Sequence, residues 1–194
     1  MSSSHPYQAL LSTERLSLVP LSSEHLSFEL ALDSNPSVTR YLFPIPRTPD
    51  QIRDSHERRL EVAIEEPGFG YWIGILNDEP IGLFMLTPPE GEDDNEASTQ
   101  GEIGYRLLPQ FGRRGLGTAG SRAVMRYAFL DLGLERIFAQ TMAVNTASRA
   151  TMVKLGMRFV RSFYMEFDES IAGAEEGEVE YAITRSEWQA SQTL

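Results

Sequence analysis

Residues 111–120 read FGRRGLGTAG, and this stretch decides between the folds that the chain could adopt. It contains the pattern G-x-G-x-x-G at residues 115–120. In dinucleotide-binding folds this pattern binds a pyrophosphate under two conditions: it directly follows a buried parallel strand, and an acidic residue ends the next strand, about 20 positions on. Here the preceding strand alternates and ends at Pro109, and Glu135 lies at the start of the next strand. No Lys-Ser or Lys-Thr follows the glycines, so the context excludes a dinucleotide-binding fold and a P-loop.

The stretch still predicts an anion site. A helix is expected from about 116 to 132, because apolar residues recur there at helical spacing. First-turn N–H groups have no intrahelical partner and carry partial positive charge, which suits a pyrophosphate. Gly115 and Gly117 let the backbone approach a ligand, while Arg113 and Arg114 either meet phosphates or stay solvated. A glycine-rich turn without a ligand stays open as the alternative.

Two motifs in this order resemble the GNAT superfamily of N-acetyltransferases, and most of all its ribosomal-protein alanine N-acetyltransferase (RimJ/RimL-like) branch. The first is the family's pyrophosphate loop Q/R-x-x-G-x-G/A, here residues 112–117, in which Gly112 replaces the usual Gln or Arg. The second is Asn145 and Ser148 followed by KLGM at 154–157. The resemblance extends from TERLSLVPL (13–21) to YAITRSEW (181–188).

This resemblance implies that acetyl-CoA is the co-substrate and that an amine attacks its thioester directly, without a covalent acyl-enzyme. The chain has no cysteine, which agrees with direct attack. A backbone N–H near the end of the strand at 100–109, around Leu107 and Leu108, is the expected oxyanion donor. In the family this strand splays from its parallel neighbour to admit the pantetheine. The residues expected to bind the co-substrate are Leu107, Leu108, Gly112, Arg113, Arg114, Gly115, Leu116, Gly117, Thr118 and Asn145.

Two residues are candidates for proton transfer. Glu102 lies on the strand that enters the loop, on the face opposite Ile103 and Tyr105, and could accept a proton from the amine directly or through water. An ordinary surface glutamate is the alternative. Ser148 could protonate the leaving thiolate, or its hydroxyl could bond to the backbone of the first helical turn. Asn145 could contact the pantetheine arm or cap its helix.

Composition narrows the function further. The 194 residues fit a single N-acetyltransferase domain over 1–194, and the net charge of −11 argues against a nucleic-acid partner. Without cysteine, and with three histidines that are not spaced as metal ligands, no metal site is expected. No apolar run is long enough to span a membrane and the N-terminus is not a secretory signal, so we expect a cytoplasmic protein. A homodimer is left open.

The predicted element order is β-α-α-β-β-β-α-β-α-β-β. It indicates an α/β (α+β) fold with a single mixed, mostly antiparallel sheet of about 6–7 strands flanked by about 4 helices. A first strand is expected at 13–21, and apolar spacing predicts a helix that begins at Asp50 and ends before Pro67. A hairpin is expected at 70–88 with its turn at 77–80, and the last two strands are expected at 157–167 and 178–188. The acidic stretch Glu90–Glu96 is expected to be a mobile, exposed loop that could steer cationic substrates.

Three functions compete. The leading one is transfer of an acetyl group from acetyl-CoA to a primary amine, either on a small molecule or at a protein N-terminus. The second is a non-catalytic acyl-CoA-binding or sensing module on the same fold, and the third is a structural domain with a vestigial loop. Turnover with amines separates the first from the others, and coenzyme A binding separates the second from the third.

Overall fold

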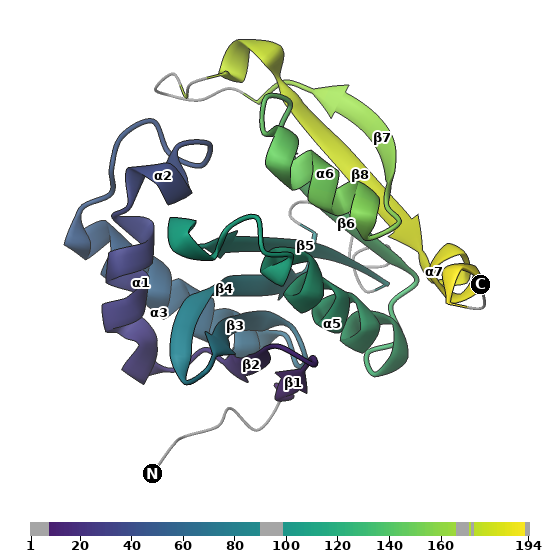
Figure 1. Ribbon diagram of the computed structural model, residues 1–194, viewed down its shortest axis with the longest axis horizontal. Coiled ribbons are helices and arrows are strands. Elements are labelled where there is room, and N and C mark those ends of the chain that lie inside the picture. Colours follow the sequence, from purple (N-terminus) through teal and green to yellow (C-terminus); the bar gives the residue numbers. More distant parts are fainter. Residues whose placement is uncertain (1–7, 90–98, 166–170, 172, 193–194) are drawn as a thin grey trace.

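The computed structural model describes residues 8–89, 99–165, 171 and 173–192, which contain one eight-stranded sheet (Figure 1). The strands are β1 (Leu11–Ser12), β2 (Ser17–Pro20), β3 (Gly70–Leu76), β4 (Glu79–Thr87), β5 (Gln100–Leu107), β6 (Arg136–Met142), β7 (Arg158–Phe163) and β8 (Glu178–Thr184). They lie in the order β1-β2-β3-β4-β5-β6-β8-β7. Among the described strands, β5 and β6 form the one parallel pair, which confirms the predicted mixed, mostly antiparallel sheet.

The sheet has eight strands rather than six or seven because the chain turns back on itself near its start. The expected strand at 13–21 is replaced by β1 and β2, which pair through Leu11 and Leu18. Thr13 makes the turn between them: its backbone N–H donates to the Leu16 carbonyl, and its hydroxyl oxygen accepts from the Leu16 N–H at 2.8 Å. This side-chain bond stabilises a tight turn where simple alternation suggested a continuous strand.

The described helices are α1 (Leu26–Asp33), α2 (Pro36–Thr39), α3 (Pro49–Glu65), α5 (Leu116–Leu130), α6 (Thr146–Lys154) and α7 (Arg185–Ser191). Four of them have eight residues or more, as expected. The strand expected to run to 188 ends at Thr184, because Thr184 and Glu187 form a capping box that begins α7. None of the described helices has the length and apolar character needed to cross a membrane.

The β3–β4 hairpin confirms the expected turn and shows how tight it is. Leu76 pairs with Glu79, so two residues, Asn77 and Asp78, make the connection. Their φ angles of 50° and 65° are left-handed, which Asn and Asp tolerate better than most residues. The expected loop at 90–96 lies outside the described residues, and its predicted exposure and mobility remain predictions.

The helices cover the two faces of the sheet unequally. On one face α5 packs on β4 and β5, and a continuous core forms around side chains such as Trp72, Phe84 and Phe129. On the other face α1 and α3 pack over the first half of the sheet, around Leu21, Leu32, Ile73 and Leu83. Figure 1 shows α1 and α3 beside β2–β4, with β6, β7 and β8 extending away from them.

The two halves of the sheet separate between β5 and β6. These strands pair only from Gln100 with Arg136 to Glu102 with Phe138, although β5 continues to Leu107 and β6 to Met142. Figure 1 shows β8 and β7 running obliquely to β4 and β5. The result is a gap at the carboxyl ends of two parallel strands, the place where open α/β sheets commonly bind ligands.

Candidate active site

The gap between β5 and β6 exposes backbone N–H groups of β5. The N–H of Leu108 donates to the Ile81 carbonyl at 2.9 Å, so it is already used. Because alternate residues of a strand direct their N–H groups to opposite edges, the N–H of Leu107 points away from β4 and toward the gap. Of the two residues expected to supply an oxyanion donor, Leu107 is therefore the one with suitable geometry.

The glycine loop connects β5, which forms one side of the gap, to α5. Arg113 and Gly115 both have left-handed backbone conformations, with φ of 59° and 75°. Gly115 is the N-cap of α5, so the N–H groups of Leu116, Gly117 and Thr118 form its first turn, where helix geometry provides no intrahelical acceptor. A Cβ on Gly115 would meet only a guanidinium nitrogen of Arg15, at 3.8 Å. The loop therefore keeps its donors together and leaves space beside Gly115.

Gly117 is required for a different reason. A Cβ on Gly117 would lie 2.4 Å from the ring of Tyr105, so this glycine makes room for an aromatic side chain. The ring of Tyr105 also stacks on Phe84, with centroids 6.0 Å apart. Gly112, which departs from the usual Gln or Arg, lies near only the Pro109 carbonyl, where a Cβ would be 3.1 Å from the oxygen.

Tyr105 bridges the sheet to α6, a role that the sequence did not indicate. Its hydroxyl lies 2.8 Å from the Thr151 hydroxyl, which also lies 3.1 Å from the Ala147 carbonyl. Thr151 donates its proton to that carbonyl, so Tyr105 donates to Thr151. Ser148 lies three residues before Thr151 and therefore on the same side of α6. The side chain of Asn145 has two partners within the protein, since it accepts from the Ser148 N–H at 3.2 Å and donates to Thr141 at 3.0 Å.

Glu102 lies at the point where β5 and β6 separate, on the face that α1 and α3 leave uncovered. The faces expected for β5 are confirmed: Ile103 is buried in the α5 core, whereas Glu102 lines a cavity of about 470 Å³ on the other side. We call this cavity the Glu102 groove; it is lined by Pro89, Gln100, Glu102, Arg136, Phe138, Gln140, Val160, Arg161 and Glu180. Glu102 and Ser148 thus approach the gap from opposite faces of the sheet.

Glu180 accepts hydrogen bonds from three other residues that line the groove. It accepts from Arg136 at 2.5 Å and from Arg161 at 2.9 Å, and Gln140 lies 3.3 Å away. Burial alone would raise the pKa of Glu180, but hydrogen bonds and charge from Arg136 and Arg161 outweigh burial and lower it. Glu180 is therefore ionised at neutral pH. The side chain of Arg161 remains 60% exposed at the groove.

Beside the groove, β5 is tied to α1 and α3 by buried ion pairs. Asp33 is fully buried and contacts two guanidinium groups, Arg59 Nη2 at 2.9 Å and Arg106 Nε at 2.9 Å. Arg59 also contacts Glu29, which pairs with His56. Burial lowers the pKa of Arg106 to about 10, and the charge of Arg59 contributes to this. Arg106 therefore stays protonated at neutral pH.

A family model described as an acetyltransferase (GNAT) domain matches residues 15–158, which include β5, the glycine loop, β6 and α6. The chain belongs to the GNAT acetyltransferase family. It is an acetyl-CoA-dependent N-acetyltransferase that acts on an amine, which confirms the family and activity predicted from the two motifs.

The relatives of this acetyltransferase act on different amines. It is 40% identical over 184 residues to the FsC-acetyl coenzyme A-N(2)-transacetylase of Aspergillus fumigatus, covering 93% of this chain and 78% of the relative. Spermidine N-acetyltransferase from Vibrio cholerae, solved with CoA and spermine, is 18% identical with a TM-score of 0.74, covering 91% and 99%. RimL, a ribosomal L7/L12 alpha-N-protein acetyltransferase solved with CoA, is 17% identical with a TM-score of 0.72, covering 89% and 95%. The two structures share the fold.

Proposed function

We propose that this acetyltransferase transfers the acetyl group of acetyl-CoA directly to a primary amine of a small molecule bound in the Glu102 groove. The observation that carries the proposal is the position of Glu102, at the point where β5 and β6 separate and on the wall of the groove. A cavity of about 470 Å³ lies within the size range of small-molecule sites. The relative named as an N(2)-transacetylase supports an amine nitrogen as the acceptor.

The glycine loop fits the pyrophosphate of acetyl-CoA. The first-turn N–H groups of α5 and the space beside Gly115 suit an anionic group. The Arg113 and Arg114 side chains add positive charge at the same end of the helix. In our proposal, backbone N–H groups from Arg113 to Thr118 hold the pyrophosphate, and the gap between β5 and β6 admits the pantetheine arm.

Three groups of the chain then serve the transfer. Glu102 accepts a proton from the amine, directly or through a water molecule, so that the nitrogen attacks as a neutral amine. The N–H of Leu107 stabilises negative charge on the carbonyl oxygen. Ser148 donates a proton to the departing thiolate from the other side of the sheet. No thiol in the chain could carry the acetyl group, which supports a single direct transfer.

A protein N-terminus is the second candidate acceptor. It is the acceptor expected of the RimJ/RimL-like branch, so the two are proposed together. The two motifs and the shared fold of RimL support it. An α-amine has a pKa of about 7.7–8.0, whereas a lysine amine has about 10.4, so an α-amine needs less help to lose its proton. The proposal favours a small molecule because the cavity beside Glu102, about 470 Å³, has the size of a small-molecule site.

The decisive experiment follows thiol release from acetyl-CoA with a panel of amines, including spermidine, amino-acid amides and alanyl and seryl peptides. Preference for small amines over peptides is expected, and preference for peptides would instead support the RimJ/RimL-like branch. Binding of CoA without turnover on any amine would contradict the proposed transfer. The best acceptor is then used to test the two proton-transfer residues.

Glu102→Gln should lower kcat/KM most near neutral pH, where the amine is mostly protonated, and the deficit should shrink as pH approaches the amine pKa. The expected loss lies within the roughly 10²–10⁴-fold of one general base.

Ser148→Ala should lose less of its kcat/KM than Glu102→Gln, because a thiolate whose conjugate acid has a pKa of about 8.5 leaves readily at high pH. Both variants should bind CoA normally. Glu79→Gln, an exposed glutamate at the β3–β4 turn, is the matched control; a wild-type pH profile for Glu102→Gln would remove Glu102 from the mechanism.

A further inference from the structure

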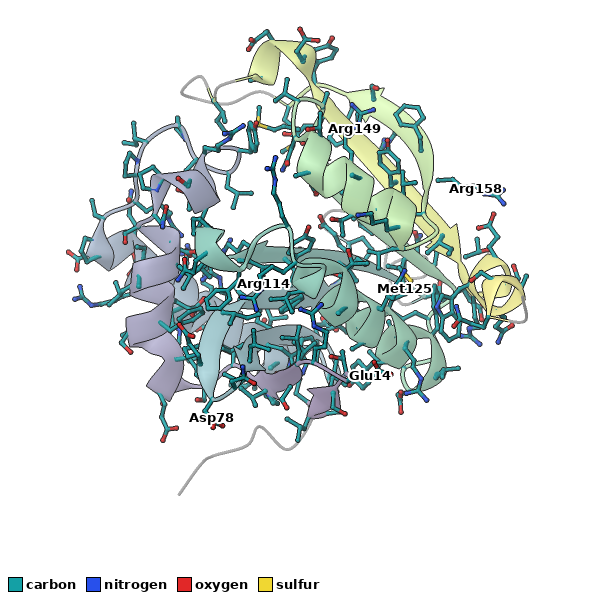
Figure 2. The ribbon with its side chains drawn as sticks, in the orientation of Figure 1. Glu14, Asp78, Arg114, Met125, Arg149 and Arg158 are labelled. Carbon is teal, nitrogen blue, oxygen red and sulfur yellow. The ribbon has the colours of Figure 1, made fainter. Side chains whose placement is uncertain are left out.

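The turn between β1 and β2 reaches the glycine loop. Arg15 Nη1 donates a hydrogen bond to the backbone carbonyl of Arg114 at 2.8 Å, although the two residues are 99 positions apart. The carbonyl that it holds directly precedes Gly115, the N-cap of α5. Figure 2 labels Glu14, the neighbour of Arg15 in this turn, and Arg114 in the loop. An exposed arginine from the start of the chain is thus part of the proposed pyrophosphate site.

The turn itself is held firmly. The Thr13 hydroxyl accepts from the N–H groups of Arg15 at 3.1 Å and Leu16 at 2.8 Å. Leu16 is buried in the core beneath α5, and β1 packs against α5. Because its backbone is anchored on both sides, Arg15 needs to order only its own side chain to reach the loop.

The hydrogen bond controls the direction of one donor. In a trans peptide the carbonyl and the N–H point in opposite directions, and none of the described peptide bonds is cis. When Arg15 draws the Arg114 carbonyl to its side, the N–H of Gly115 is turned to the other side. The loop needs such an anchor because Arg113, a residue with a Cβ, is held at a φ of 59°, a strained conformation.

We propose that Arg15 is a positioning residue for acetyl-CoA: it holds the Arg114 carbonyl away from the pyrophosphate and thereby directs the N–H of Gly115 toward it. Without this bond the carbonyl is free to rotate toward the phosphates, which would place a negative dipole where a donor is needed. The inference rests on the proposed binding of the pyrophosphate in this loop. It makes the turn at 13–16 part of the co-substrate site.

The test compares Arg15→Ala and Arg15→Lys with the wild type and with Arg53→Ala. Arg53 is a matched control, an exposed arginine with one short ion pair, to Asp50 of α3. By calorimetry, Arg15→Ala should bind CoA about tenfold more weakly, a loss of about 1.4 kcal/mol. Pantetheine, which lacks the pyrophosphate, should bind to Arg15→Ala and to the wild type with the same affinity. Lysine can still donate one hydrogen bond to the carbonyl, so Arg15→Lys should recover part of the affinity.

Two further measurements separate positioning from other roles. Dephospho-CoA lacks only the 3′-phosphate, so Arg15→Ala should weaken it as much as CoA; a loss confined to CoA would mean that Arg15 contacts the 3′-phosphate and would overturn the proposal. The Gly115 amide resonance of the ligand-free protein should shift in Arg15→Ala but not in Arg53→Ala. An unmoved resonance would also overturn the positioning role.

Steady-state kinetics complete the comparison between Arg15→Ala and the wild type. The KM for acetyl-CoA should rise in Arg15→Ala while kcat and the KM for the amine stay within about twofold, because a general loss of structure would change all three. If Arg15→Ala binds CoA like the wild type, Arg15 is only a surface contact, and the proposed function stands. If the wild type itself does not bind CoA, the proposed function fails instead.

Discussion

Gly115 and Gly117 lie two residues apart in one sequence motif, yet the structure requires each glycine for a different reason. Gly115 has a left-handed φ of 75° with open space beside it, whereas Gly117 leaves room for the ring of Tyr105. The sequence motif treats both glycines alike, as positions where the backbone approaches a ligand. Only the packing of Tyr105 from β5 distinguishes them.

This difference predicts different effects of the two substitutions on CoA binding. Gly117→Ala should destabilise the fold by about 1–3 kcal/mol, because its Cβ would overpack the Tyr105 ring. For a chain of this length that corresponds to about 2–4 °C of Tm per kcal/mol. Gly115→Val should lower the affinity for CoA, because its branched side chain would enter the space proposed for the pyrophosphate. It should also lower the stability, because a β-branched residue is strained at the left-handed φ of 75°. Thermal unfolding and calorimetry on both variants test this; equal affinities of the two variants for CoA would contradict it.

At the scale of elements, β8 carries two glutamates whose pKa values shift in opposite directions. Burial raises the pKa of Glu178 above its ordinary value. For Glu180, burial acts the same way but the hydrogen bonds from Arg136 and Arg161 prevail and lower the pKa. The two side chains are two residues apart on the same face of the strand. The arginine partners of Glu180, rather than its position along β8, therefore decide whether the pKa is raised or lowered.

The sign of each shift sets a pH dependence. Glu180, with a lowered pKa, contributes stability that is present above its ordinary pKa of 4.5 and is lost as pH falls through the lowered value. Glu178 does the reverse and costs stability once pH rises through its raised pKa. We therefore expect Glu180→Gln to destabilise the protein and Glu178→Gln to stabilise it at pH 7. Urea unfolding at pH 7 and at pH 4 measures the free energy of unfolding of both variants. The difference in this free energy between the two variants should be smaller at pH 4.

At the scale of the whole molecule, the buried ion pairs around Asp33 join three elements that are distant in sequence. Asp33 of α1 contacts Arg59 of α3 and Arg106 of β5. Arg106 directly precedes Leu107, whose N–H is the proposed oxyanion donor. The network therefore connects α1 and α3 to the strand that forms one side of the gap.

Asp33→Ala should lower the free energy of unfolding by about 3–5 kcal/mol, because it leaves buried guanidinium groups without one of their carboxylate partners. Asp50→Ala is the control, since Asp50 makes an exposed ion pair with Arg53 and should change stability little. Denaturant unfolding measures both variants. A loss for Asp33→Ala as small as that of the control would show that water or rearrangement compensates the two arginines.

The sequence by itself determined the elements and the motifs that rest on local rules. Apolar periodicity located α3, α5 and the strands from β3 to β8, and Asn145 marked the start of α6. The loop at 112–117 with the motif after Asn145 identified the family. Alternation along β5 also predicted the opposite faces of Glu102 and Tyr105. These features depend on neighbours within a few residues, which is why one chain without its structure was enough.

The tertiary structure alone decided which of these residues meet. The gap between β5 and β6 depends on where pairing stops, and the Glu102 groove depends on which strands α1 and α3 leave uncovered. The bond from Arg15 to the Arg114 carbonyl and the bridge from Tyr105 to Thr151 join segments 99 and 46 positions apart. Periodicity and spacing describe one segment at a time, whereas such contacts arise only when the sheet brings separate segments together.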